Sequence, residues 1–267
     1  MDKTQGKFAA PPLQEDETAD ALPNGLRVLQ KKRGNRFSLD AFLLASFVGP
    51  GRPGAILDLG TGSGVLALLL SGLRPGSRFL GVEIQPALVD MARRTVAWQG
   101  LGDQVVITQG DVRQIEARVS VGTFDMVVTN PPYRRPASGR INPNGEKALA
   151  RHEILGNLDD FLRAAAYALR PGGRVYLVYP ARRMATLLAD MRQHRLEPKR
   201  CRLVHSFPEK RGEFILTEGV AGGGEEMTVL PPLYIYHPDG TYSSAMQGIF
   251  NDLAASAGGD GGISPEP

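Results

Sequence analysis

Cysteine and long apolar runs are scarce in this sequence, and each scarcity excludes a class of protein. The 267 residues contain one cysteine, Cys201, which excludes an intramolecular disulfide and a cysteine-cluster metal site. No apolar run approaches the roughly 20 residues that a membrane helix needs, and the first 20 residues lack the apolar core of a secretory signal. We therefore expect a cytoplasmic protein with no membrane segment and no bound metal.

The composition is that of a globular protein. Hydrophobic residues make up 42% of the chain and charged residues 22%, which is enough for one sizeable core. Residues 1–20 mix charge with Pro and Ala, and the carboxyl end is rich in Gly, Ser and Pro. We expect disordered tails at 1–20 and 246–267 around a single domain at 21–245.

Apolar strands and helices alternate along the middle of the chain. The predicted strands are 55–59, 78–84, 104–108, 124–129 and 174–179, and the predicted helices are 39–48, 65–72, 86–99, 158–169 and 181–194. This alternation predicts an α/β fold with a parallel sheet covered on both faces. Three further strands without helices, in a basic segment at about 197–240, predict an antiparallel edge to the sheet.

A glycine-rich turn follows the strand at 55–59. The segment DLGTGSG, residues 58–64, has glycines at 60, 62 and 64, which permit a tight turn and a close approach of a ligand to the backbone. The dinucleotide pattern G-x-G-x-x-G is not met, because residue 65 is Val. The spacing resembles the turn of S-adenosylmethionine (SAM) methyltransferases, and a plain glycine turn is the alternative.

Acidic residues follow the next two strands. Glu83 ends GVE about 20 residues beyond the glycines, where an acid accepts hydrogen bonds from ribose hydroxyls. It predicts a nucleoside ligand without distinguishing SAM from a nicotinamide cofactor. Asp111 follows the third strand, and the methyltransferase resemblance places its carboxylate near the adenine amine. Each acid is otherwise a helix cap or a solvated loop residue.

The strand at 124–129 runs directly into NPPY, residues 130–133. Pro131 and Pro132 have a fixed φ and no N–H, and Asn130 precedes a proline, so its backbone is extended. The side-chain oxygen of Asn130 and the carbonyl of Pro131 become stiffly aimed acceptors for an NH2 group, and Tyr133 offers a face for stacking. Holding both hydrogens of an adenine N6 amine aims its lone pair at the sulfonium methyl group. A proline turn without chemistry is the alternative.

Basic residues follow this corner and crowd the last third of the chain. RNA phosphates require such an excess of positive charge on one surface, whereas solvated helix faces carry Lys and Arg in any protein. The candidate RNA contacts are Arg134, Arg135, Arg151, Lys199, Arg200, Arg202, Lys210 and Arg211.

Eight segments match, in order, those of one known family. They are RFSLDAFLLA (36–45), ILDLGTGSG (56–64), GVEIQ (81–85), NPPY (130–133), ARHEI (150–154), EPKR (197–200), EGVAGG (218–223) and LPPLYIY (230–236). Over about Leu22 to Tyr242 the sequence resembles the bacterial methyltransferases that modify N6 of adenosine 37 in a valine-accepting tRNA. The resemblance implies a Rossmann-like class I fold with a mostly parallel seven-stranded sheet. It also implies SAM as methyl donor, S-adenosylhomocysteine as product, tRNA as partner and no obligatory protein partner.

The resemblance also assigns roles to residues. Asn130, Pro131, Pro132 and Tyr133 correspond to the catalytic motif. The implied cofactor contacts are Phe37, Ser38, Asp40, Asp58, Gly60, Thr61, Gly62, Gly64, Glu83, Ile84, Asp111, Val112 and Asn130. The alternative for Phe37 and Ser38 is a structural role, since a phenylalanine before a serine cap packs as a hydrophobic staple on the helix that follows.

Two other functions share the NPPY corner. One is methylation of a glutamine side chain in peptide release factors, because an amide nitrogen poses the same chemical problem as an adenine amine. In that family a sizeable helical domain precedes the DLG motif, whereas 57 residues precede Asp58 here. The other is adenine methylation of ribosomal RNA or DNA, against which only the segments outside the core motifs argue.

Overall fold

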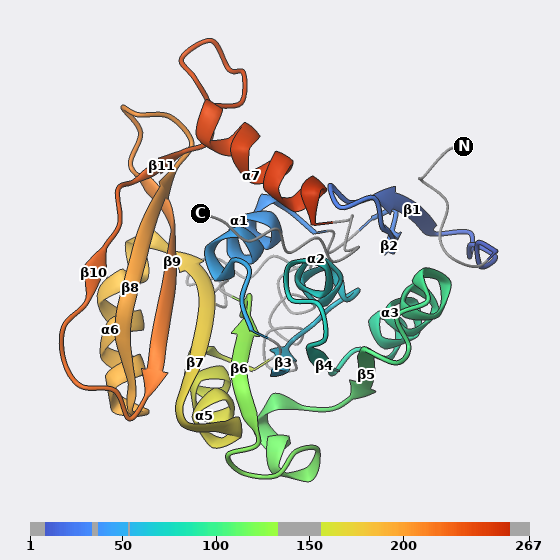
Figure 1. The fold of residues 1–267 in the computed structure, drawn as a ribbon, viewed down its shortest axis with the longest axis horizontal. Helices are drawn as coiled ribbons and strands as arrows, with labels where there is room; N and C mark the ends of the chain where they lie inside the picture. Colours follow the sequence, from blue (N-terminus) through green and yellow to red (C-terminus); the bar gives the residue numbers. More distant parts are fainter. Residues whose placement is uncertain (1–8, 34–36, 53, 133–155, 257–267) are drawn as a thin grey trace, which may run out of the picture.

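Short apolar strands assemble into one large sheet (Figure 1). The computed structural model describes residues 9–33, 37–52, 54–132 and 156–256. The sheet has the strand order β10-β8-β9-β7-β6-β3-β4-β5, and β11 pairs with β8. Seven of its strands have five residues or more: β3 (Ala55–Leu59), β4 (Arg78–Glu83), β5 (Val105–Gln109), β6 (Phe124–Thr129), β7 (Leu169–Pro180), β8 (Leu196–His205) and β9 (Gly212–Ala221). The other two, β10 (Thr228–Val229) and β11 (Leu233–Tyr234), have two residues each.

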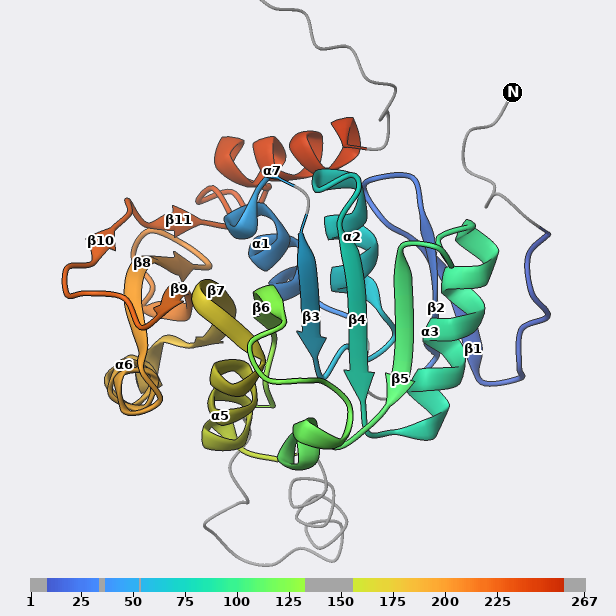
Figure 2. The same ribbon diagram turned by 60° about the horizontal axis from the view of Figure 1, so that its bottom comes forward.

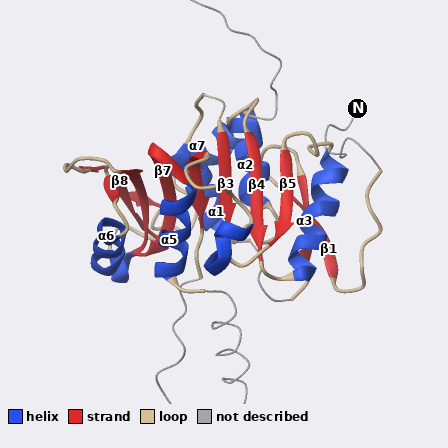
Figure 3. Cartoon of the chain, turned by 90° about the horizontal axis from the view of Figure 1, so that it is seen from below, coloured by secondary structure: helices blue, strands red, loops and turns tan. Residues whose placement is uncertain are grey.

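The predicted mostly parallel sheet with an antiparallel edge is confirmed. The strands β5, β4, β3, β6 and β7 pair in parallel in that order. β9 is antiparallel to both β7 and β8 and lies between them, and β8 and β10 follow it at this end of the sheet. β8 therefore points in the same direction as β7. Figure 3 shows the strands as a row from β8 to β5.

Helices cover both faces of this sheet (Figure 2). One hydrophobic core joins the sheet to α1 (Leu39–Val48), α2 (Val65–Leu73), α3 (Pro86–Gln99) and α7 (Ser244–Ala255). The second core joins the opposite face to η1 (Val112–Ala117), α5 (Leu158–Ala168) and α6 (Met184–Gln193), the last of which follows the short η2 (Ala181–Arg183). Successive side chains of a strand point to opposite faces of the sheet, so a strand covered on both sides contributes to both cores. Ile56 belongs to the first core and Leu57 to the second. Among the described residues, no helix combines the length and apolarity needed to cross a bilayer.

Both expected tails were wrong in part. Residues 17–20 belong to β1 (Glu17–Ala21), which pairs antiparallel with β2 (Arg27–Lys31) in a separate two-stranded sheet. Residues 246–255 belong to α7, which buries Met246, Ile249 and Leu253. These three apolar residues recur at helical spacing, so the sequence carried a signal that its Gly- and Ser-rich end obscured.

The proline and two glycines at 171–173 predict a turn that closes the helix 158–169 before the strand 174–179, and this prediction was wrong. Pro171, Gly172 and Gly173 lie inside β7, where the register against β6 shifts between Phe124 and Met126. Gly172 has a φ of +75°, and a Cβ on Gly173 would lie 2.8 Å from the backbone oxygen of Arg170. The segment is therefore a glycine-dependent bulge in a continuous strand and not a break between elements.

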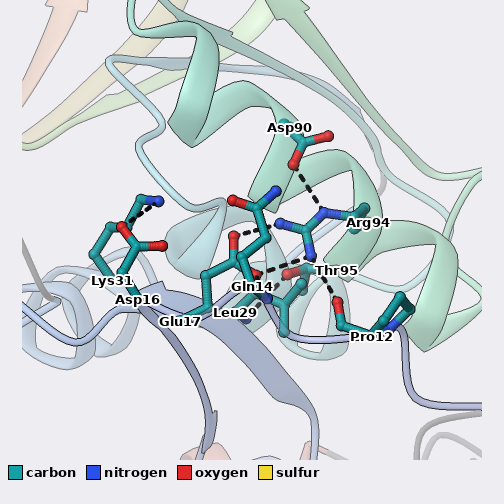
Figure 4. A network of polar contacts seen from close by, with 9 residues as sticks. All are labelled: Pro12, Gln14, Asp16, Glu17, Leu29, Lys31, Asp90, Arg94 and Thr95. Carbon is teal, nitrogen blue, oxygen red and sulfur yellow. Dashed lines mark hydrogen bonds and ion pairs between the residues drawn. The ribbon is translucent and has the colours of Figure 1, made fainter.

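A buried ion pair attaches the β1–β2 hairpin to α3 (Figure 4). The guanidinium of Arg94 donates to both carboxylate oxygens of Glu17, at 2.5 and 3.0 Å, and to Asp90 at 2.8 Å. The Glu17 side chain is fully buried, whereas that of Asp90 is 54% exposed. Beside this pair, the hydroxyl of Thr95 accepts a hydrogen bond from the Leu29 N–H at 3.1 Å.

The difference in burial predicts unequal effects of two alanine variants. We expect Arg94→Ala to lower the free energy of unfolding of the hairpin by about 3 kcal/mol, because it leaves the Glu17 carboxylate buried without its cation. Asp90→Ala should lower it by about 0.5 kcal/mol, since exposed pairs contribute little. Hydrogen exchange of the β2 amides measures both. Equal protection in the two variants would contradict the assignment of Glu17 as the buried anchor.

Candidate active site

The carboxyl ends of four parallel strands meet at one edge of the sheet. Leu59 is paired with Val82 on one side and with Thr129 on the other. Glu83 is paired with Gln109. The Thr129 hydroxyl donates to the backbone oxygen of Leu59 at 2.8 Å, which ties the end of β6 to the end of β3. The glycine turn, the acid of β4, the Asp111 segment and the NPPY corner therefore converge, as ligand sites in open α/β sheets do.

The glycine turn at 60–64 has the conformation that its sequence predicts. Gly60, Gly62 and Gly64 have φ values of +70°, +59° and +85°. The N–H groups of Gly60 and Thr61 donate to the backbone oxygen of Val82 at 2.8 and 3.1 Å. A Cβ built on Gly62 meets no atom within 4 Å, so the backbone there faces open space. The turn thus fits a ligand that approaches the main chain, as SAM is expected to do.

Glu83 combines a structural role with spare hydrogen-bonding capacity. The residue is 5% exposed, and its Oε2 accepts from the Gly62 N–H at 3.0 Å. Its Oε1 accepts from the backbone and side-chain nitrogens of Gln85, at 2.9 and 3.2 Å. A carboxylate has about four acceptor positions, so Glu83 can still accept from a ribose hydroxyl.

Asp58 is buried behind the same turn. The residue is 2% exposed, and its Oδ2 accepts a hydrogen bond from the Thr61 hydroxyl at 2.6 Å. Burial raises the pKa of the Asp58 carboxyl to about 7, and the negative charge of Glu83 adds to the rise. Asp58 therefore takes up a proton near neutral pH, and its protonation state changes the charge next to the expected cofactor pocket.

This raised pKa predicts a pH dependence of stability. The folded state holds the Asp58 proton up to about pH 7, whereas the unfolded chain releases it near the ordinary value of 3.8. Stability from this group is therefore present at low pH and is lost as the pH rises, by roughly 1.4 kcal/mol per pH unit. Between about pH 5 and about pH 7, the advantage of the wild type over Asp58→Asn should fall by about 2.5 kcal/mol in urea unfolding. Parallel pH curves for the two proteins would contradict the raised pKa.

Gly81 is a site residue that the sequence interpretation missed. It lies in β4, and a Cβ there would be 2.7 Å from Ile107 Cδ1 and 2.8 Å from Thr61 Cγ2. A side chain at this position would displace Thr61 from Asp58. The signal was available, because a glycine inside a strand indicates a close approach of another group.

Asp111 is engaged by a neighbouring arginine. It precedes η1, and its Oδ1 accepts from the backbone N–H of Arg113 at 2.9 Å. Asp111 therefore caps η1, as the sequence allowed besides a cofactor contact. The Arg113 guanidinium also bonds Oδ2 at 2.6 Å, and this hydrogen bond is the main cause of the lowered pKa of Asp111. Val112 is buried and Ile84 is half-buried at the same edge. Contacts of these three residues with the cofactor remain predictions.

The start of α1 supports the packing alternative for Phe37. Its ring contacts that of Phe42 with centroids 5.4 Å apart, which is the hydrophobic staple, and its N–H donates to Gln30 Oε1 at 2.8 Å. Ser38 is exposed at the N-cap position, but its side chain makes no capping hydrogen bond. Asp40 is 4% exposed in the first turn. The role of these three residues in cofactor binding stays a prediction.

The NPPY corner begins where β6 ends. Asn130 is exposed at the carboxyl edge, Pro131 is buried and Pro132 is half-buried. Tyr133 lies outside the described residues, as do Arg134, Arg135 and Arg151. A buried proline after an exposed asparagine holds the polar side chain at a rigid position, which suits an acceptor that must orient a substrate amine.

The remaining candidate RNA contacts divide into side chains that are bonded or half-buried within the chain and side chains that are exposed. The guanidinium of Arg200 donates to Glu218 Oε2 at 2.7 Å and to the Phe47 backbone oxygen at 2.9 Å, so it already has two partners within the chain, and its role as an RNA contact stays a prediction. Lys199 donates to the backbone oxygens of Gly224 and Glu225, and Arg202 is half-buried in the middle of β8. Lys210 and Arg211 are exposed in the β8–β9 turn.

Comparison with known proteins supports the methyltransferase interpretation. The model of the methyltransferase small domain matches residues 38–195. A relative from Porphyromonas gingivalis named tRNA1(Val) (adenine(37)-N6)-methyltransferase is 33% identical over 68% of this chain and 73% of its own. One of the same name from Parabacteroides distasonis is 27% identical over 72% of this chain and 79% of its own. A Streptomyces pristinaespiralis relative named 4-amino-L-phenylalanine/4-methylamino-L-phenylalanine methyltransferase is 32% identical over 72% of this chain and 60% of its own.

Solved structures support the fold. A crystal structure of a protein from Agrobacterium tumefaciens, described as a predicted O-methyltransferase, superimposes with a TM-score of 0.66 at 21% identity. It covers 80% of this chain and 97% of the other. Fold, motifs and relatives agree that the chain is a SAM-dependent methyltransferase of the α/β Rossmann-like class, and it belongs to the methyltransferase small-domain family, together with relatives named tRNA1(Val) (adenine(37)-N6)-methyltransferase.

Proposed function

We propose that this enzyme transfers a methyl group from SAM to N6 of adenosine 37 in the anticodon loop of a valine-accepting tRNA. The observation that carries the proposal is the position of Asn130 and Pro131, which follow β6 directly beside the glycine turn of β3. Two relatives with different source organisms bear the name of this activity. Matching segments outside the core motifs, such as EPKR and LPPLYIY, favour this substrate over release factors or ribosomal RNA.

The mechanism assigned to the corner is positioning. An adenine N6 lone pair is delocalised into its ring, so the amine is a weak nucleophile. The Asn130 side-chain oxygen and the Pro131 carbonyl accept its two hydrogens, and this favours a pyramidal nitrogen with its lone pair directed at the electrophile. SAM supplies, when bound, a methyl group already activated by positive sulfur. A strong base is not needed, because the methylated nitrogen becomes acidic and releases its proton readily.

The cofactor is assigned to the pocket formed by the glycine turn and the acids of β3 to β5. The Glu83 carboxylate accepts from the ribose hydroxyls, and the backbone at Gly62 allows the ligand to approach closely. Asp111 keeps its carboxylate ionised beside Arg113 and accepts from the adenine amine of the cofactor. The start of α1, with Phe37, Ser38 and Asp40, contributes to the methionine side of the pocket.

One relative favours a second candidate substrate. Its name indicates methylation of an aromatic amine on an amino acid, and such a nitrogen is conjugated with a ring as the adenine amine is. The same two-acceptor corner could therefore serve a free arylamine. The basic side chains at the carboxyl edge, Lys210 and Arg211, favour a polyanion over a small amino acid.

The test is a substrate panel with labelled SAM. The purified enzyme is incubated separately with valine tRNA transcript, ribosomal RNA, release factor and 4-amino-L-phenylalanine, and any methylated tRNA is digested to map the nucleoside. We expect label only in N6-methyladenosine at position 37. A tRNA whose adenosine 37 is replaced by guanosine is the matched control and should remain unlabelled. Label on glutamine or on the arylamine alone would remove the tRNA assignment.

A further inference from the structure

A groove lies beyond the carboxyl ends of β7 and β8. Its volume is about 570 Å³, and it is lined by residues from η2, the β8–β9 turn and the adjoining strand ends. Pro180 ends β7 three residues after Leu177, which pairs with Thr129 at the end of β6. Strands rise about 3.3 Å per residue and neighbouring strands lie about 4.8 Å apart, so Pro180 lies roughly 10 Å from the end of β6, at the same edge of the sheet. The groove is therefore within reach of nucleotides that flank a base held at Asn130.

Three basic side chains line this groove: Arg182 on η2, and Lys210 and Arg211 in the β8–β9 turn. No ion pair joins any of the three to a carboxylate within the described parts of the chain. The turn itself is held in shape, because the Lys210 N–H donates to the Phe207 oxygen at 3.1 Å and the His205 ring bonds the Lys210 oxygen at 2.7 Å. These hydrogen bonds fix the backbone that carries Lys210 and Arg211 at the groove.

The acidic residues nearby do not cancel this charge. Glu213 lines the groove, and its carboxylate accepts a hydrogen bond from the Ser206 hydroxyl. Glu209 is exposed in the same turn. The lining itself keeps three cations against one carboxylate, which suits a ligand with more than one negative charge.

Aromatic rings continue from the groove toward the start of α1. Phe207 lines the groove, and its ring contacts that of Tyr236 at 5.4 Å between centroids. Tyr236 stacks on Tyr242 at 5.3 Å and 19°, and Tyr242 is 38% exposed. Further ring contacts join Tyr242 through Phe250 and Phe42 to Phe37 at the start of α1. Phe207 is half-buried and lines the groove together with the three cations, and a positively charged groove with an aromatic ring is the combination that binds single-stranded nucleic acid.

We propose that this groove holds the unpaired nucleotides next to the target adenosine, with their phosphates at Arg182, Lys210 and Arg211 and a base against Phe207. The assignment rests on the proposed function for its substrate, but it adds a binding site one strand away from the catalytic corner. It also gives Arg200 of β8 a structural role in place of an RNA contact, since Arg200 is bonded to Glu218 and to the Phe47 oxygen.

The experiment measures binding of two labelled probes by fluorescence anisotropy, at several salt concentrations and without SAM. The probes are the anticodon stem-loop of valine tRNA and a single-stranded RNA of about 10 nucleotides. The double variant Lys210→Ala with Arg211→Ala should weaken binding about 10-fold and reduce the slope of log affinity against log salt by about 1.4. Phe207→Leu should weaken binding about 10-fold with an unchanged slope, because stacking releases no counterions.

The matched control removes two cations from the opposite edge of the sheet. Arg52 and Arg78 are exposed before β3 and at the first residue of β4, so Arg52→Ala with Arg78→Ala should leave affinity and slope unchanged. Equal losses in both double variants would overturn the groove assignment, because they would reflect net charge alone. Displacement of RNA by polyglutamate at equal charge concentration would also overturn it in favour of an acidic protein partner.

Methyl transfer to tRNA by the same proteins separates this inference from the proposed function. If the wild type methylates adenosine 37 and the groove variants bind and turn over as it does, the groove is wrong and the function stands. If no tRNA is methylated while RNA binding still depends on the groove residues, the function is wrong and the groove stands.

Discussion

Asn130→Ala should reduce methyl transfer about 1,000-fold while SAM affinity stays within about twofold of the wild type. The variant removes one of the two acceptors proposed to hold the substrate amine. Asn130 is exposed, so its truncation should change the free energy of unfolding by less than about 0.5 kcal/mol. Single-turnover rates with saturating tRNA and calorimetric titration with SAM measure the two effects separately.

Asn130→Asp is the informative control for this prediction. The aspartate keeps an acceptor oxygen at the same position and should retain at least about 10-fold more activity than the alanine variant. A parallel loss of SAM affinity and turnover in Asn130→Ala would show that Asn130 is mainly a cofactor contact. Full activity in the alanine variant would remove the corner from the mechanism.

Glu83→Ala should weaken SAM binding about 100-fold, because hydrogen bonds to a charged group contribute roughly 1.5–3 kcal/mol each. Two effects combine in this variant. The ribose hydroxyls lose their acceptor, and the Gly62 N–H loses the carboxylate oxygen that holds the turn at 3.0 Å. Equilibrium titration with SAM measures the loss, and the product S-adenosylhomocysteine, which has the same ribose, should show the same factor.

Gln85→Ala is the control for Glu83→Ala, because it changes a neighbour of the Glu83 carboxylate and keeps the carboxylate itself. Gln85 donates its side-chain N–H to the same carboxylate at 3.2 Å, and the variant keeps its backbone N–H bond. We expect at most about a threefold change in SAM affinity. Wild-type affinity in Glu83→Ala would mean that the carboxylate serves the turn alone and does not contact the cofactor.

The local elements of the fold could be predicted closely because their signals are local. The bounds of α1, α3, β3 and β6 agree with the sequence interpretation. Pro86 at the first turn of α3 and the glycines at 60, 62 and 64 each restrict the backbone on their own. The segment Pro171 to Gly173 misled, since proline and glycine mark a bulge as readily as a turn, and only the register against β6 distinguishes the two.

Long-range partners decided the features that could not be predicted. Arg200 and Lys210 are both cations in the basic segment, but Arg200 packs over the Phe47 ring at 4.5 Å while Lys210 lines the groove. The difference depends on which segments pack against each side chain, and the residue type alone does not predict them. The same holds for Gly81, whose importance comes from the Thr61 and Ile107 side chains packed against it.

The sequence by itself determined the class of chemistry, because a glycine turn, a strand-end acid and two prolines after an asparagine restrict the backbone wherever they occur. It also determined the alternation of strands and helices, and hence a parallel sheet with its ligand edge at the carboxyl ends. Only the tertiary structure decided that β9 lies between β7 and β8, that residues 17–20 and 246–255 are ordered, and which basic side chains line a groove or bond to a carboxylate. Those outcomes depend on pairing and packing between segments that are far apart in the sequence, because each segment determines how deeply its partner is buried.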